Sequence, residues 1–461
     1  MEILVINVCL RPHSPARYFP IGLAYIATAM KNAGWRFDLL DIEALRYSDD
    51  EITAFIAQKE YAVVCIGTLV TGYAAVKSLA AIVRRIHPHA KIIAGNTVAT
   101  PIADTLLMKT DVDVAVMGEG DVTIVELLSA LNHAQSLDDV KGIAFKQGGR
   151  VVRTGRRSYI RDISHIPMID YSLFDVERYA GFSQHTVSDP LPLARDHIRA
   201  FPVNTARGCI ERCTFCYHNF DGVPYRYRRA DSLIREIEFL VSRYGINYIQ
   251  FADELSFFSK EQIGDLLGKI MESGLRFYWI ATCRAGLFAD DRDLELLHKM
   301  KEAGCAGIGY SLESAEPRIL EAMKKHIVPD LFSRQTSLLH KARIPVWTSI
   351  VLGYPQETHE TINKTFDCCI ANGIYPSTGY LLPLPGSSMY RYAREHKFIK
   401  DEEEYLLTMG ERQDLRINMT AMPDEEFRET VMKELKRCND ALNIGLESEN
   451  LIKTKYYRVP K

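Results

Sequence analysis

The sequence lacks the features that mark membrane, secreted and nucleic-acid-binding proteins. No apolar run approaches the roughly 18 residues that a membrane-spanning helix needs, so we expect no segment to cross a bilayer. The net charge of −3 gives no long-range attraction to nucleic acid or to an anionic membrane. The chain shows no secretory signal peptide, no internal repeat and no low-complexity segment. We therefore expect a cytoplasmic globular protein with no nucleic-acid partner.

The composition is that of an ordinary globular protein with several domains. A length of 461 residues predicts about three domains. The apolar fraction of 47% and the charged fraction of 25% exclude global disorder. Ten cysteines in a chain of this size, without a signal peptide, indicate a reducing compartment rather than a disulfide-stabilised scaffold.

Residues 1–140 alternate between short apolar runs and amphipathic stretches. The apolar runs, rich in valine and isoleucine, predict buried strands at residues 2–8, 37–42, 61–68, 91–95 and 112–118. The amphipathic stretches predict helices at residues 21–34, 50–59, 73–86 and 123–133. This α/β alternation predicts a doubly wound, Rossmann-like parallel sheet that binds ligands at the carboxyl ends of its strands.

The rest of the chain predicts a linker, a second α/β unit and a helical end. Residues 141–200 form a hairpin, turning at Gly148 and Gly149, and an irregular linker. In residues 201–390, strands are predicted at residues 203–206, 248–252, 276–282, 307–312, 346–352 and 377–382. Six strand–helix units fit a partial (β/α)6 barrel of the TIM type, with its chemistry at the carboxyl ends of the strands. Residues 391–461 predict a helical C-terminal region, including a helix at 424–443.

Three of the ten cysteines, Cys209, Cys213 and Cys216, lie within eight residues, after the first predicted barrel strand. Three thiolates in one loop favour an iron–sulfur cluster or zinc. A closed zinc site needs a fourth ligand, for which His218 is the neighbouring candidate. A cluster held by three cysteines instead leaves one iron open to another molecule. A zinc-stabilised binding protein remains an alternative.

The spacing Cys209-x3-Cys213-x2-Cys216, with Phe215 before the last cysteine, resembles the signature of the radical SAM enzymes. This resemblance implies that the three cysteines hold a 4Fe–4S cluster. The open iron would bind S-adenosylmethionine, and reduction would cleave it to a 5′-deoxyadenosyl radical that abstracts hydrogen from a small-molecule substrate. It also implies an oxygen-sensitive enzyme with a one-electron reductant such as flavodoxin or ferredoxin as its partner.

The same resemblance implies roles for residues at the other strand ends. The cofactor-binding candidates in the barrel are Asp253, Glu254, Arg284, Ser311, Glu313 and Gly353. Carboxylates there can accept hydrogen bonds from an ammonium group or ribose hydroxyls, and an arginine can clamp a carboxylate. Glycine at position 309 or 353 would let the backbone approach a flat adenine. Glu254 and Tyr217 are the catalytic candidates for acid–base chemistry.

Residues 1–140 resemble the cobalamin (B12)-binding domain that one radical SAM subfamily carries. The segment Gly118-Glu-Gly-Asp-Val-Thr123 is similar to its Gly-Glu-Gly-Glu-x-Thr pattern, and residues 95–100 to its Gly-Gly-x-His-x-Thr loop. The resemblance implies a corrin at the strand ends, with cofactor-binding residues Gly95, Thr100, Gly118, Glu119 and Gly120. Asn96 and Val98 depart from the pattern, and the cobalt-ligating Asp-x-His-x-x-Gly motif is absent.

Two reactions are open to such an enzyme. With cobalamin bound, the expected reaction is methyl transfer to an unactivated carbon in a biosynthetic pathway. The alternative is a cobalamin-independent radical SAM dehydratase, cyclase or rearrangement enzyme that keeps the N-terminal domain only for its structure. The replacement of a glycine by Asn96 favours this alternative.

Overall fold

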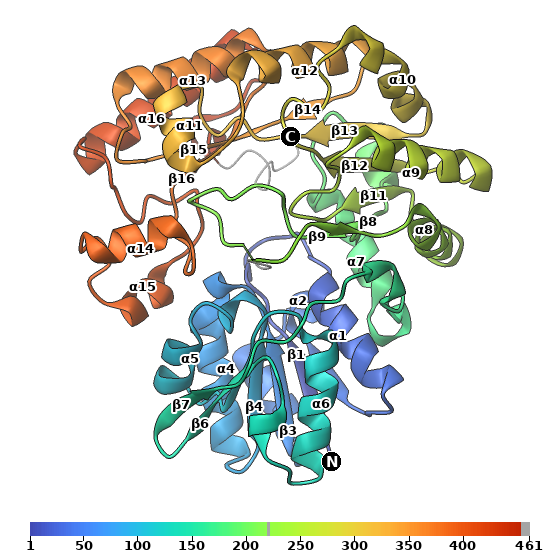
Figure 1. Cartoon of the computed structure of the whole chain (residues 1–461), viewed down its shortest axis with the longest axis vertical. Coiled ribbons are helices and arrows are strands. Elements are labelled where there is room, and N and C mark those ends of the chain that lie inside the picture. Colours follow the sequence, from blue (N-terminus) through green and yellow to red (C-terminus); the bar gives the residue numbers. More distant parts are fainter. Residues whose placement is uncertain (219–221, 453–461) are drawn as a thin grey trace. The chain divides into compact units, whose positions relative to one another are not determined.

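A computed structural model describes residues 1–218 and 222–452 and divides the chain into two units (Figure 1). Unit 1 contains Met1–Tyr179 and Ile399–Met409, and unit 2 contains Ala180–His218, Pro224–Phe398 and residues 410–452. Within the described ranges, every helix is too short or too polar to cross a bilayer, as the sequence predicts.

Unit 1 contains a seven-stranded sheet in the order β2-β1-β3-β4-β5-β6-β7. Its parallel strands are β1 (Ile3–Asn7), β2 (Asp38–Asp41), β3 (Val63–Gly67), β4 (Lys91–Gly95) and β5 (Val114–Val116). All five confirm predicted strands. The predicted hairpin is β6 (Ile143–Gln147) and β7 (Arg150–Arg153), which extends the sheet in antiparallel orientation.

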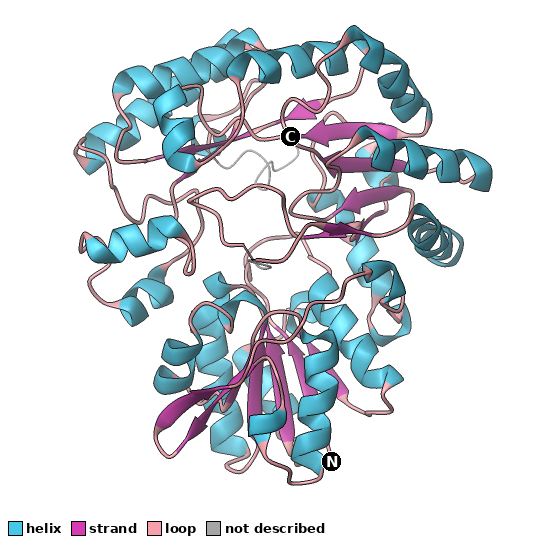
Figure 2. Cartoon of the chain, in the orientation of Figure 1, coloured by secondary structure: helices cyan, strands magenta, loops and turns pink. Residues whose placement is uncertain are grey.

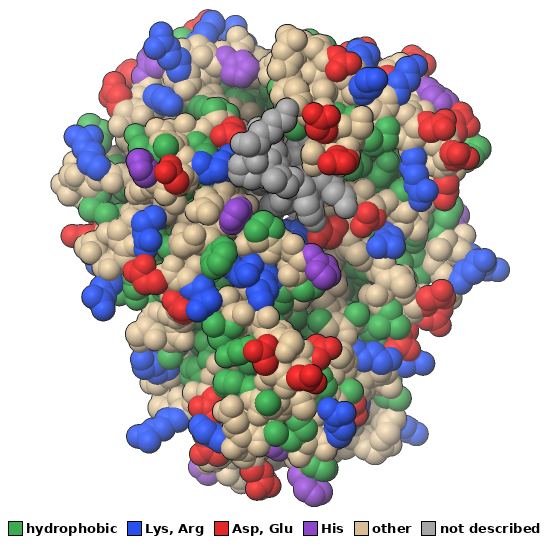
Figure 3. All heavy atoms as spheres, turned by 180° about the vertical axis from the view of Figure 1, so that it is seen from behind, with side chains coloured by type: hydrophobic (Ala, Val, Ile, Leu, Met, Phe, Trp, Pro, Cys, Tyr) green, Lys and Arg blue, Asp and Glu red, His purple; other side chains and the backbone are tan. Residues whose placement is uncertain are grey.

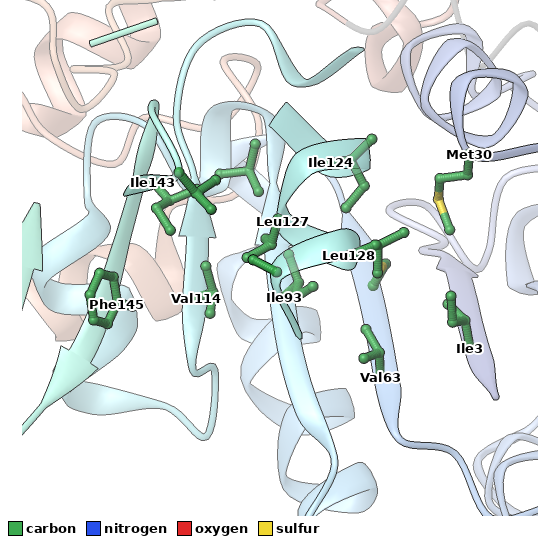
Figure 4. Close-up of a cluster of buried hydrophobic side chains, with 14 of the residues drawn as sticks. Ile3, Met30, Val63, Ile93, Val114, Ile124, Leu127, Leu128, Ile143 and Phe145 are labelled. Carbon is green, nitrogen blue, oxygen red and sulfur yellow. The ribbon is translucent and has the colours of Figure 1, made fainter. Parts of the chain in front are cut away.

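Helices cover this sheet, and their apolar faces form its core. They are α1 (Ile21–Asn32), α2 (Ile42–Leu45), α3 (Asp49–Ile56), α4 (Tyr73–Ile86), α5 (Ala103–Lys109) and α6 (Gly120–Asn132). Figure 4 shows Leu127 and Leu128 of α6 beside Ile93 and Val114 of the sheet, and all four side chains are buried. Burial of such side chains is the main stabilising contribution to this unit.

A helix near the C-terminal end of the chain also belongs to unit 1. Helix α15 (Glu402–Thr408) lies in the segment Ile399–Met409. Its residue Glu403 is 2.5 Å from Nζ of Lys77 on α4 and accepts a hydrogen bond from the Tyr73 hydroxyl at 3.3 Å. Sequence periodicity alone carries no information about such a long-range contact. The neighbouring helices α14 (Ser388–Glu395) and α16 (Asp424–Ala441) belong to unit 2.

Unit 2 is the predicted partial barrel. Five parallel strands lie in the order β14-β13-β12-β11-β8, and β15 pairs with β16. The strands are β8 (Ala200–Val203), β11 (Tyr248–Phe251), β12 (Tyr278–Thr282), β13 (Cys305–Gly309), β14 (Val346–Trp347), β15 (Ser349–Leu352) and β16 (Ser377–Tyr380). A parallel bridge between Glu313 and Ile350 links the two sheets.

The barrel helices follow their strands in sequence, and Figure 2 shows them outside the strands. They are α8 (Ala230–Tyr244), α9 (Lys260–Ser273), α10 (Leu294–Glu302), α11 (Pro317–Met323), α12 (Pro329–Lys341) and α13 (His359–Ala371). α7 (Val176–Gly181) precedes the barrel in the chain. This α/β architecture confirms the predicted fold class.

Two predicted strands differ from the structure. The first barrel strand ends at Val203, and β9 (Ala206–Arg207) instead pairs antiparallel with β10 (Arg226–Tyr227). The predicted strand at residues 346–352 is broken at Thr348, whose hydroxyl oxygen accepts a hydrogen bond from the Leu312 N–H at 2.9 Å. At Thr348 a side-chain hydroxyl takes part in place of a ladder partner, and such a contact is not visible in local sequence patterns.

Charged side chains of both signs are interspersed over the face drawn in Figure 3. This distribution agrees with the net charge of −3. Among the residues drawn in colour on that face, no large area carries charges of one sign only.

Substitutions at two glycines of the barrel can test its packing. Gly304 has φ +90°, and a Cβ atom there would lie 2.2 Å from the backbone oxygen of Phe277; Gly274 has φ +66° and open space around it. We expect Gly304→Ala to lower the free energy of unfolding by about 3 kcal/mol or more, because backbone must move. Gly274→Ala should cost only about 1 kcal/mol, the penalty of the left-handed conformation. Equal losses in thermal or urea denaturation would contradict this packing.

Candidate functional site

The segment that leads into the cysteines is held by Asp253, at the carboxyl end of β11. Its carboxylate accepts hydrogen bonds from the Thr205 N–H at 2.9 Å, the Thr205 hydroxyl at 2.6 Å and the Ala206 N–H at 3.0 Å. Asn204 Nδ2 donates a further one at 3.0 Å. Burial raises the pKa of Asp253, and these hydrogen bonds oppose the rise. Asp253, expected as a cofactor ligand, thus uses its oxygens to position the cysteine segment.

Thr214 anchors the cysteine loop, residues 209–216, to the barrel. Its N–H donates to the Met323 oxygen at 2.8 Å, and its own oxygen accepts from the Met389 N–H at 2.9 Å. Its hydroxyl donates to the Ala322 oxygen at 2.8 Å and lies 2.8 Å from the Tyr354 hydroxyl. Every polar group of Thr214 therefore has a partner. The sequence alone does not reveal this residue, because no local pattern distinguishes an anchoring threonine.

The three cysteine thiols are free and lie within electrostatic reach of one another. Burial raises the pKa of Cys213 and of Cys216 to about 12, and the charges of neighbouring cysteines add to this rise. Among the described residues, no three His, Cys, Asp or Glu side chains are grouped to hold a single metal ion. Nε2 of His218, the fourth ligand of the zinc alternative, lies 3.2 Å from the Cys213 backbone oxygen.

Glu313 is a buried carboxylate beside this loop, with only 4% of its surface exposed. Its charge raises the pKa of Cys213 and Cys216. Its backbone has φ +60°, and its N–H donates to the Ser349 oxygen at 3.0 Å. In the described structure its Oε2 atom is buried without a hydrogen-bond partner. Such an oxygen fits a ligand that donates a hydrogen bond, as ribose hydroxyls do.

Lys325 supplies the positive charge of the site. Its Nζ atom lies 3.8 Å from Oε1 of Glu313, and 15% of its side chain is exposed. Burial lowers the pKa of Lys325, but the charges of Glu313, Cys213 and their neighbours outweigh burial and raise it. The ammonium group in turn lowers the pKa of Cys209 and Cys213 against the effect of burial. The sequence gives no motif for this lysine, which follows α11.

The other predicted barrel residues differ in how they interact with the cysteine loop. Glu254 has an exposed side chain, and its charge raises the pKa of Cys209 and Cys216. Tyr217 directly follows the loop, and its backbone oxygen lies 3.5 Å from Sγ of Cys216. Oγ of Ser311 lies 2.8 Å from Oγ of Ser349. Arg284 follows β12 with an exposed side chain, and its charge lowers the pKa of Cys283.

The two glycines expected near adenine have neighbours from the protein itself. A Cβ atom at Gly309 would lie 2.2 Å from Nε1 of Trp347, so the flat ring against this glycine is an indole. Gly353 has φ +114°, packs against Phe427, and donates its N–H to Oε2 of Glu357 at 3.3 Å. Burial raises the pKa of Glu357 to about 7. Both glycines therefore have packing reasons to be small.

In unit 1, Thr100 joins the two loops that carry the predicted cofactor residues. Its hydroxyl oxygen accepts a hydrogen bond from the Gly118 N–H at 3.1 Å and lies 3.4 Å from the Asn96 oxygen. Glu119 accepts a hydrogen bond from the Ile160 N–H at 2.7 Å, which ties the linker to this edge. Gly120 begins α6, and a Cβ atom there would lie 2.8 Å from Cδ1 of Ile26.

The departure at Asn96 stands at a backbone position that favours glycine or asparagine. Gly95 ends β4 in extended conformation, and Asn96 adopts φ +71°. Asparagine tolerates this left-handed region better than other non-glycine residues, so it can replace a glycine there. Val98, which stands where the pattern has histidine, is fully buried.

Two family models match the chain in the regions described above. The B12 binding domain matches residues 9–128, and the radical SAM superfamily matches residues 203–369. They confirm the two domain types that the sequence analysis expects. The cofactors that these domain types imply are also the expected ones, namely a 4Fe–4S cluster, S-adenosylmethionine and cobalamin.

Individual relatives extend over most of the chain. An uncharacterised methyltransferase of Pyrococcus horikoshii is 27% identical over 379 residues, covering 81% of this chain and 78% of the relative. A cytidylyl-2-hydroxyethylphosphonate methyltransferase of Streptomyces wedmorensis is 26% identical, with 94% and 89% covered. The solved structure of the radical S-adenosylmethionine methyltransferase TsrM of Kitasatospora setae, with cobalamin and a 4Fe–4S cluster bound, has a TM-score of 0.67 at 18% identity. It covers 86% of this chain and 78% of that one, and confirms the fold.

The anchoring role of Thr214 can be tested with Thr214→Val. This change keeps the shape of the side chain but leaves the Ala322 oxygen and the Tyr354 hydroxyl without their partner. We expect a loss of about 1–3 kcal/mol in stability and a lower iron content after anaerobic reconstitution. Thr408→Val is the matched control, because that exposed hydroxyl contacts only the Glu404 oxygen of its own helix. Equal iron contents in the two variants would show that Thr214 does not anchor the loop.

Proposed function

This chain belongs to the radical SAM superfamily and carries a B12 binding domain, and we propose that it is a cobalamin-dependent methyltransferase acting on an unactivated carbon of a small molecule. The observation that carries the proposal is the presence of both domains in one chain, each with its expected loop residues at the carboxyl ends of its strands. The two relatives named above, both methyltransferases by name, support it.

In the barrel, Cys209, Cys213 and Cys216 are the ligands that would hold the cluster. When bound, the cluster and S-adenosylmethionine supply a 5′-deoxyadenosyl radical, and cobalamin supplies a transferable methyl group. The chain itself orients these groups and excludes water. Glu313 would accept a hydrogen bond from a ribose hydroxyl at its Oε2 atom, which has no partner in the described structure. Lys325 would balance the negative charge of the thiolates and of Glu313. Thiolates must form for ligation, and a buried ammonium nearby favours them.

The remaining barrel candidates have supporting roles in this proposal. Glu254 is exposed, and its charge raises the pKa of Cys209 and Cys216, so we assign it to the methionine ammonium or to acid–base chemistry with Tyr217. We assign Arg284 to the methionine carboxylate, because a guanidinium can clamp a carboxylate with paired hydrogen bonds. Ser311 contributes a hydroxyl beside Glu313, and Gly353 shapes the turn after β15.

In unit 1, the corrin site is formed by Gly95, Thr100, Gly118, Glu119 and Gly120. The hydrogen bond between Thr100 and Gly118 holds the two loops together, and the N-terminus of α6 offers N–H groups to phosphate or amide groups of a ligand. Asn96 at φ +71° keeps the glycine-like backbone of the first loop. A left-handed backbone at this position is compatible with the glycine of the family's loop pattern and supports corrin binding despite the altered sequence.

The cluster ligands are tested by replacing single cysteines. We expect Cys213→Ala to abolish the iron–sulfur absorbance and the reductive cleavage of S-adenosylmethionine, because one of three ligands is lost. Cys305→Ala is the control, since that thiol is buried in β13. Absorbance spectra, iron analysis and 5′-deoxyadenosine production measure the outcome. An intact cluster in Cys213→Ala protein would refute the assignment.

The corrin site is tested by anaerobic titration with hydroxocobalamin, followed by absorbance and quantitation of bound corrin. We expect about one corrin per chain in the wild-type protein and in Asn96→Gly. Asn96→Val should lose most corrin binding, because a β-branched residue is strained at positive φ. Radical formation without any bound corrin in the wild-type protein would instead support the dehydratase, cyclase or rearrangement alternative.

A further inference from the structure

Strands β15 and β16 carry serine side chains on one face of the barrel sheet. Ser349 and Ser377 are register partners in this parallel pair. Tyr380 points to the other face, since its ring packs edge-on against Phe427 of α16 with centroids 5.4 Å apart. Because side chains alternate along a strand, Ser377 and Gly379 lie on the face turned away from this helix.

Arg412 lies across this face. Its stem covers Gly379, where a Cβ atom would lie 2.8 Å from the arginine Cδ. Its Nη2 atom donates to Oγ of Ser377 at 2.9 Å and to the Ser377 backbone oxygen at 3.2 Å. Its backbone oxygen accepts a hydrogen bond from the Tyr380 N–H at 2.7 Å. Hydrogen bonds from both the backbone and the side chain of Arg412 therefore hold its guanidinium group in place.

The charge of Arg412 is not balanced within the part of the chain that the structure describes. No carboxylate in residues 1–218 or 222–452 forms an ion pair with it, whereas Arg416 in the same segment lies 3.8 Å from Asp414. Arg412 is partly buried, which makes an unbalanced charge costly. A guanidinium has five N–H donors, and the contacts with Ser377 use only its Nη2 atom.

Serine residues lie between Arg412 and the backbone of Glu313. Ser377 is the register partner of Ser349, whose Oγ atom lies 2.8 Å from Oγ of Ser311. The Ser349 backbone oxygen accepts the N–H of Glu313 at 3.0 Å. Arg412 therefore contacts β16, whose register partner Ser349 on β15 contacts Ser311 and the backbone of Glu313.

From this arrangement we propose that Arg412 and Ser377 bind an oxyanion of the substrate, a carboxylate or a phosphate group. A guanidinium forms paired hydrogen bonds to two oxygens of one oxyanion, and a serine hydroxyl adds a further donor. The charged end of the substrate is then fixed at β16, and its remaining part lies along Ser349 and Ser311. This inference rests on the proposed function, because it takes this face of the barrel as the substrate site.

The test is calorimetric titration of the full-length, anaerobically reconstituted protein with inorganic phosphate and, separately, with acetate. We expect binding of at least one of them above a sodium chloride control of equal ionic strength. Arg412→Met should weaken it about tenfold or more, because a charge-assisted pair is lost. Arg412→Lys should retain part of the affinity, and Arg416→Met should retain all of it. A preference for phosphate or for acetate identifies the substrate group.

Ser377→Ala provides a second variant that keeps Arg412 in place and should weaken the same binding severalfold. S-adenosylmethionine affinity should be unchanged in both variants, because the site is assigned to the substrate. Equal oxyanion binding by wild-type and Arg412→Met protein would overturn the inference, as would loss of S-adenosylmethionine binding in Arg412→Met. Cluster absorbance and 5′-deoxyadenosine production in the same preparations show separately whether the proposed function itself holds.

Discussion

The barrel site depends on the hydrogen bonds that Asp253 accepts from the turn after β8. A carboxylate at the end of one parallel strand captures backbone and side-chain donors of Thr205 and Ala206 and thereby ends the neighbouring strand at Val203. The cysteine loop can leave the sheet only because the ladder stops there. Thr214 then fixes the far side of the loop to the ends of α11 and the start of α14. Two short polar networks thus hold both sides of the segment that carries the three thiols.

Two sets of electrostatic effects change the pKa of those thiols in opposite directions. Burial and mutual repulsion hold the pKa of Cys213 and Cys216 near 12, which favours neutral thiols in the protein without a metal. Lys325 acts in the opposite direction, and it also balances the buried carboxylate of Glu313. Because ligation needs thiolates, a cluster held by these cysteines would displace their protons, and its assembly would be coupled to proton release. In the proposed function, the ammonium that balances Glu313 would favour those thiolates.

In both units, the residues assigned to ligands lie in loops at the carboxyl ends of the parallel strands, but the chemical groups differ. In unit 1, loops at the strand ends are joined by Thr100 and Gly118, with Asn96 in a left-handed conformation. In unit 2, carboxylates, thiols and an ammonium occupy the equivalent ends. Arg412 shows that a segment outside the strand–helix repeats also contributes to the barrel face. The sheets supply position, and the loops supply chemistry.

The sequence alone determined most of the strands and helices, the two domain types and the cysteine triplet, because apolar periodicity and short-range spacing are local properties. It did not reveal Thr214, Lys325 or Arg412, nor that Asp253 serves the loop and Trp347 covers Gly309. These roles arise from contacts between residues far apart in the chain, which no local pattern encodes. Only the tertiary structure decided which strand-end side chains form hydrogen bonds within the protein and which keep polar atoms available for a ligand. Asp253 is of the first kind and Glu313 of the second, because these hydrogen bonds form between residues far apart in the chain.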